Sequence, residues 1–161
     1  MDLTFLFPWV LLLHIFGAIL AFGPTYAYAI IGAMGGKEPQ HGNFASRVTA
    51  QIGTRLVTPL ALLQGITGLA LVWIGQIPLM STPWLLIAIA LYVFAITYAL
   101  TVQKQALHRV IDLTSGPPPT GAPAGPPPGL PETVAKIQRG GMMLGLIIFV
   151  IVLLMVLKPS F

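Results

Sequence analysis

The chain has 161 residues, of which 56% are apolar and only 7% are charged, and its net charge is +4. A soluble domain carries roughly a quarter of charged residues, so most of this chain is predicted to face lipid rather than water. Cysteine is absent, which excludes disulfides, thiolate metal sites, iron–sulfur clusters and covalently attached c-type haem.

Four uncharged apolar runs predict four membrane-spanning helices, at about residues 7–32, 56–76, 83–103 and 140–157. Each run has about the length of ~20 residues that a helix needs to cross a bilayer. The first run lacks a basic segment before it and is longer than the apolar part of a signal peptide, so it is predicted to be a retained span. The predicted fold is all-α: one integral membrane four-helix bundle over residues 1–161.

The first span is expected to begin near Pro8 and to end at Gly32 and Gly35-Gly36, with a kink at Pro24. Proline removes one backbone donor, which leaves the carbonyl of Leu20 without its helical partner. After a short polar loop, Asn43 is predicted to cap a helical extension that leads into the second span.

The third span opens with a hydroxyl residue and Pro83, which is typical of a helix start. Residues 114–131 then contain eight prolines and four glycines, a composition that predicts an extended, polyproline-like linker. A short helix starting at Pro131–Thr133 is expected to continue into the fourth span.

The basic residues predict the orientation of the bundle. Seven of the eight lie in the first and third connections: Lys37, Arg47, Arg55, Lys104, Arg109, Lys136 and Arg139. Basic residues gather on the cytoplasmic side of membrane proteins, so both termini are expected outside and the proline-rich loop in the cytoplasm, in a bacterial inner membrane. Because these charges lie at helix ends, they indicate anchoring at a lipid surface and no nucleic-acid partner.

Small residues recur at helical spacing on several spans and predict the faces that pack. The set comprises Gly17 and Ala21 on the first span, Gly65 and Gly68 beside Gln64 on the second, and Gly141 and Gly145 on the fourth. Small side chains let helix backbones approach closely, which is a main source of helix association in lipid. Gln64 is expected to lie near Pro24 and to donate to the freed carbonyl of Leu20.

His14 is the ionisable side chain that lies well inside a span. An intramembrane histidine is a candidate functional residue, and three roles stay open: a structural hydrogen bond, a haem or metal ligand, or proton handling. For haem b, Met155 is the same-side candidate for a second ligand, since His41 and His108 belong to the opposite side. Paired carboxylates, phosphate loops and nucleophile motifs are missing from the sequence, so no catalytic residue is assigned.

Short motifs in all four spans resemble a bacterial family of predicted four-helix integral membrane proteins of unknown function. They are residues 13–18 with Phe22-Gly23, residues 65–69, Pro83-Trp84-Leu85 and residues 155–159. That family looks allied to the membrane-type protoporphyrinogen oxidase (the HemJ type) and to copper-resistance D proteins.

The oxidase type carries a pattern like Trp-x-Lys-x-x-His in its first helix, and Trp9 and His14 stand at that spacing here. Leu11 occupies the lysine position, and residues 85–89 lack the lysine expected in the third helix. The resemblance therefore implies a haem-facing position for His14. The two lysines of the oxidase pattern have no counterpart in this chain, so the resemblance does not imply their roles.

Three functions are compatible with these observations. The first is a non-enzymatic membrane subunit or scaffold that packs with other membrane proteins or with its own copies, in an assembly such as an energy-transducing complex. The second is a b-type haem protein or haem-linked oxidoreductase that uses His14. The third is a small transporter, which the lack of charged pairs inside the spans disfavours.

Overall fold

The computed structural model describes residues 3–116 and 125–159, and within them the chain is helical without strands. The long helices are α1 (Phe7–Lys37), α2 (Gly42–Ile52), α3 (Thr58–Ile74), α4 (Pro83–Tyr98), α5 (Lys104–Thr114) and α6 (Leu130–Leu157). Short 3₁₀ turns are η1 (Thr4–Leu6), η2 (Pro39–His41) and η4 (Leu79–Ser81). Four continuous helical segments in the described part are long and apolar enough to cross a membrane, which confirms the predicted fold class.

Two of these segments each contain one π-helical turn. The turn η3 (Gly53–Val57) joins α2 to α3, and η5 (Ala99–Gln103) joins α4 to α5. A π turn adds one residue to a helix turn and shifts the faces that follow it. The sequence pattern predicted neither turn.

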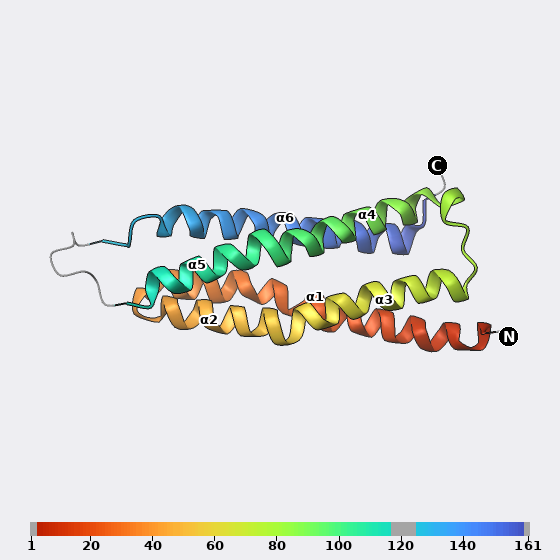
Figure 1. The fold of residues 1–161 in the computed structure, drawn as a ribbon, viewed down its shortest axis with the longest axis horizontal. Helices are drawn as coiled ribbons and strands as arrows, with labels where there is room; N and C mark the ends of the chain where they lie inside the picture. The colour runs from red at the N-terminus through yellow and green to blue at the C-terminus, as the bar shows by residue number, and fades with distance from the viewer. Residues whose placement is uncertain (1–2, 117–124, 160–161) are drawn as a thin grey trace.

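The helices form two antiparallel pairs that lie side by side (Figure 1). One pair is α1 with α2 and α3, and the other is α6 with α4 and α5. The two pairs join most closely where α2 packs against α5. Both termini lie at the opposite end of the molecule, which we call the terminal end.

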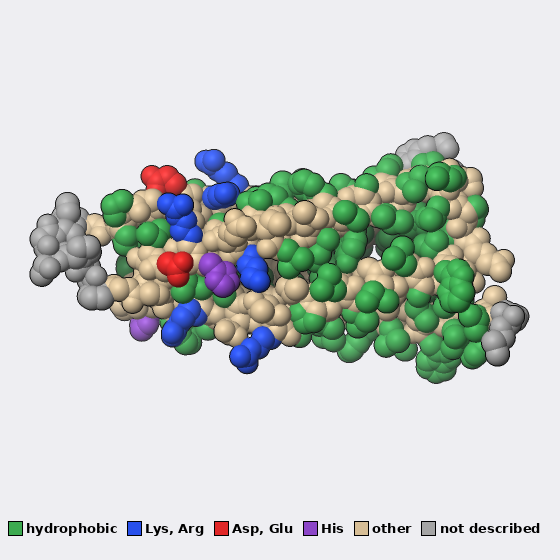
Figure 2. All heavy atoms as spheres, viewed as in Figure 1, with side chains coloured by type: hydrophobic (Ala, Val, Ile, Leu, Met, Phe, Trp, Pro, Cys, Tyr) green, Lys and Arg blue, Asp and Glu red, His purple; other side chains and the backbone are tan. Residues whose placement is uncertain are grey.

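The helices are longer than the predicted spans. At a rise of about 1.5 Å per residue, α1 extends over about 46 Å, whereas the hydrocarbon core of a bilayer is about 30 Å thick. The excess lies at the end away from the termini, where Lys and Arg side chains gather and the continuous apolar surface stops (Figure 2). We call this end, which carries the seven basic residues named above, the basic end.

Helix α1 passes through Pro24 and continues for extra turns beyond Gly32 to Lys37, directly after Gly35-Gly36. Helix α2 packs on the extra turns: a Cβ added to Gly35 would lie 3.0 Å from the Ala45 Cβ. Packing against a neighbouring helix thus outweighs the low helix propensity of glycine at this place.

Asn43 does not cap α2, so that prediction is wrong. His41 holds the cap position, and the Asn43 amide Nδ2 donates to the Ile111 carbonyl at 3.1 Å, the Thr114 hydroxyl at 3.0 Å and the Ser115 hydroxyl at 3.2 Å. The side chain therefore ties the start of α2 to the end of α5, at the junction of the two helix pairs.

The predicted linker 114–131 falls partly on residues 117–124, which lie outside the described residues. At the edges of this segment, Thr114 ends α5, and Pro131 lies in the first turn of α6, where a helix start was also expected. Gly129 precedes α6 with φ of 82°, and its carbonyl accepts hydrogen bonds from Thr133. As predicted, this short start continues without a break into the fourth span.

Candidate functional site

His14 meets a hydroxyl of the neighbouring helix. Its Nδ1 lies 2.9 Å from the Thr67 Oγ1, which joins α1 to α3. The Thr67 hydroxyl is buried and also lies 3.0 Å from the Leu63 carbonyl and 3.1 Å from the Gln64 carbonyl. Because a hydroxyl has one proton, donation to a carbonyl leaves its oxygen to accept from His14 Nδ1–H. In that tautomer, His14 Nε2 keeps its lone pair.

The glycines opposite this contact make room for side chains. A Cβ added to Gly68 would lie 3.2 Å from Cε1 of His14, and one added to Gly17 would lie 3.0 Å from Oε1 of Gln64. The sequence predicted close backbone packing at Gly68, but the neighbour there is the imidazole ring. Gly17 and Ala21 are both buried on α1.

Gln64 lies opposite Gly17, about two helix turns away from Pro24, so the expected bond to the Leu20 carbonyl is not formed. The error comes from the register between α1 and α3, which single-sequence patterns leave undetermined. Among the described residues, Gln64 Oε1 is a buried oxygen without a hydrogen-bond donor.

Tyr92 links α4 to α3. Its hydroxyl donates to the Ala61 carbonyl at 2.8 Å. A Cβ added to Gly65 would lie 2.6 Å from that hydroxyl, so only glycine leaves space for the tyrosine. This contact is an interhelical hydrogen bond that fixes α4 against α3.

A second glutamine–glycine contact joins the other helix pair. Gln103 Nε2 donates to the Ile137 carbonyl at 2.8 Å, and its Oε1 would lie 2.6 Å from a Cβ added to Gly140. Gly140 is buried, whereas an added Cβ at Gly145 would meet nothing within 4 Å. The neighbouring Gly141 is exposed. Within the described chain, the close contact on α6 is therefore at Gly140, one residue before the predicted pair.

The remaining candidate ligands lie on other helical elements than His14. Met155 lies on α6, in the other helix pair, and His41 and His108 lie at the basic end. His41 is within 3.8 Å of Glu38. No group of three metal-ligating side chains occurs among the described residues.

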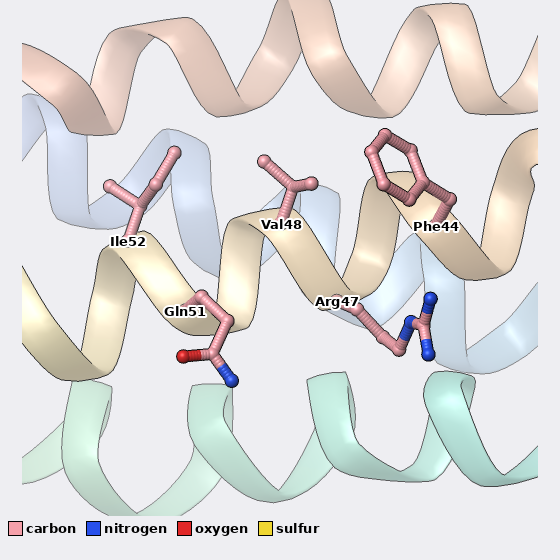
Figure 3. A pocket seen from close by; sticks show the side chains of 5 residues that line it. All are labelled: Phe44, Arg47, Val48, Gln51 and Ile52. Carbon is pink, nitrogen blue, oxygen red and sulfur yellow. The ribbon is translucent and has the colours of Figure 1, made fainter.

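Two hollows lie at the basic end, and His14 lines neither. One is a shallow groove on α2, lined by Phe44, Arg47, Val48, Gln51 and Ile52 (Figure 3). The other lies between α4 and α6 and is lined by Tyr98, Glu132, Ala135, Lys136 and Arg139. The hollow between α4 and α6 depends on how distant helices pack, so the sequence pattern did not indicate it.

Three residues of these interhelical contacts were missed by the sequence analysis: Thr67, Gln103 and Gly140. Thr67 lies three residues after Gln64 on the buried face of α3, so helical spacing could have indicated it. The place of Gln103 depends on the π turn η5, which had no sequence signal.

Comparison with known families agrees with the membrane architecture. A family model described as "Predicted integral membrane protein (DUF2269)" matches residues 8–159. No curated protein and no solved structure matches the chain. Since the match covers all four apolar helices, the chain belongs to the DUF2269 family of predicted integral membrane proteins.

Proposed function

We propose that this chain is a non-enzymatic membrane subunit that packs with other membrane helices through the outward face of α6. The supporting observation is the Gly141–Gly145 pair, a Gly-x-x-x-Gly motif. An added Cβ at Gly145 meets nothing within 4 Å in this chain. In lipid, such a motif lets a second helix approach closely.

The polar side chains between the spans support this proposal. His14, Tyr92 and Gln103 each contact a group of a neighbouring helix, as expected for residues that fix how helices pack. The imidazole ring also fills the space beside Gly68. The partner is a second copy or another protein of a bacterial inner membrane, and an energy-transducing complex is an assembly of this kind.

The test is the size of the complex in mildly solubilised membranes. The natural chain is expected to migrate well above its 17.2 kDa, and Gly145→Leu is expected to shift it to the monomer without lowering its thermal stability. Leu146→Ala is the matched control, because Leu146 is 64% exposed and lies on another face of α6. The proposal would be contradicted if the natural chain migrates as a monomer, or if Leu146→Ala disrupts the complex as much as Gly145→Leu does.

A haem-binding role is the second candidate, and one observation favours it. Thr67 engages Nδ1 of His14, and this leaves Nε2 as the nitrogen that could bind an iron. The same arrangement orients histidine ligands in many metal sites, and it is consistent with the resemblance to the membrane-type oxidase. Haem b added to the purified protein would then give a Soret band that His14→Gln abolishes. Without a band in the natural chain, this candidate fails.

A further inference from the structure

We propose that the hollow between α4 and α6 binds the phosphate headgroup of an anionic phospholipid. Lys136 and Arg139 line it together with Tyr98, Ala135 and Glu132, and its volume is about 430 Å³. Two cations and one carboxylate leave a net charge of +1. Among the described residues, no acid lies within ion-pair distance of Lys136 or Arg139. Both are therefore available to an anion from outside the chain.

The hollow lies at the depth of lipid headgroups. Residues 140–157 follow Arg139 directly, carry no charge, and extend over about 27 Å as a helix. This length nearly equals the thickness of the hydrocarbon core, so Arg139 is placed at its edge. Tyr98 is an aromatic residue of the type enriched at this boundary, and its ring stacks on Phe94 with centroids 6.1 Å apart.

The surface that continues from the hollow fits the acyl chains of the same lipid. Arg139, Leu146 and Leu153 follow one another at seven-residue spacing, so they share one face of α6. Leu146 is 64% exposed and Leu153 is 43% exposed. A cationic hollow with an apolar stripe beneath it matches a phospholipid better than a free phosphate or an acidic protein segment. Basic hollows between spans on the cytoplasmic side are known to hold such headgroups.

The groove in Figure 3 provides the contrast. It also contains a cation, Arg47, but Arg55 lies between it and the apolar span of α3. A lipid headgroup at the edge of the hydrocarbon core would therefore not reach it. Lys37→Gln with Arg47→Gln removes two positive charges from the basic end without touching the proposed site, and this pair serves as the control.

The experiment is native mass spectrometry of the protein released from nanodiscs of phosphatidylcholine and phosphatidylglycerol in a 3:1 ratio. The natural chain is expected to retain phosphatidylglycerol preferentially. Lys136→Gln with Arg139→Gln should reduce that retention about 30-fold, because the loss of each cation is expected to weaken it roughly fivefold. The charge-preserving pair Lys136→Arg with Arg139→Lys should keep it, and so should the control pair.

Several outcomes would overturn the proposal. If the control pair loses as much phosphatidylglycerol retention as Lys136→Gln with Arg139→Gln, the effect comes from the overall positive charge and not from this hollow. If Lys136→Gln with Arg139→Gln retains phosphatidylglycerol as well as the natural chain does, the hollow does not bind the lipid headgroup. An acidic protein segment would then be its remaining ligand. In nanodiscs of phosphatidylcholine alone, about 10 mM inorganic phosphate should not raise the thermal stability of the natural chain. A rise that depends on Lys136 and Arg139 would assign the site to free phosphate.

Discussion

At the scale of single residues, the interior of the bundle is organised by long polar side chains that lie on glycines of a neighbouring helix. Gln64 lies on Gly17, Tyr92 on Gly65, and Gln103 on Gly140. The sequence indicated that small residues line the packing faces, but it did not show that side chains rather than backbones fill the space. Which side chain meets which glycine depends on the register between helices, and helical periodicity within one helix carries no information on that register.

Gly68 offers a direct test of these contacts. Gly68→Leu places a branched side chain where the His14 ring lies, so the ring must leave and its bond to Thr67 is lost. We expect a loss of roughly 1–3 kcal/mol in unfolding free energy, which is typical of overpacking. The measurement is reversible unfolding in mixed micelles, with near-ultraviolet circular dichroism as a check on packing.

Leu69→Ala is the matched control, since Leu69 is 61% exposed and contacts lipid in this account. It should cost clearly less than Gly68→Leu. If both changes cost the same, the buried face of α3 has been assigned incorrectly.

At the scale of elements, the positions of the four spans followed from composition, whereas their ends did not. The first span was expected to end at Gly32 and Gly35-Gly36, and α1 runs past these glycines to Lys37 against α2. Likewise, Asn43 has the chemistry of a helix cap but binds the end of α5. In both cases a tertiary contact outweighs the local preference, which is why propensity alone misplaced the boundary.

Gly129 sets the start of α6 and can be tested separately. Its φ of 82° lies in the left-handed region, which costs a residue with a Cβ about 1–2 kcal/mol. Gly129→Ala should therefore lower the unfolding free energy by about that amount. Gly125→Ala should be nearly neutral, because an added Cβ at Gly125 meets nothing within 4 Å. Thermal unfolding of the two variants in one detergent makes the comparison, and equal stability would contradict a helix start at this place.

At the scale of the whole molecule, charge and apolar surface divide along the long axis. The terminal end is covered by apolar side chains, and the basic end carries the Lys and Arg side chains (Figure 2). This division was predictable from the sequence, because it needs only the order of charged and uncharged segments. The pairing of α1 with α3 and of α4 with α6 was not predictable, since the periodicity of one helix does not show which neighbour its small residues meet.

The charge division predicts the orientation in the membrane. A reporter that is active only outside the cytoplasm should work when fused after Phe161 and should fail when inserted at Gly125, at the basic end. A cytoplasmic reporter should give the reverse result at both positions. Activity of the first reporter at Gly125 would invert the orientation and would leave the four helices unaffected.

A structural role for His14 in a packing subunit can be tested through the absorption spectrum of the purified protein. The protein should be prepared in mild detergent from cells supplied with iron and a haem precursor. We expect no Soret band, and we expect His14→Gln to fold, because an amide can still donate to the Thr67 hydroxyl. A Soret band in the natural chain that disappears in His14→Gln would contradict the account and assign His14 as a haem ligand.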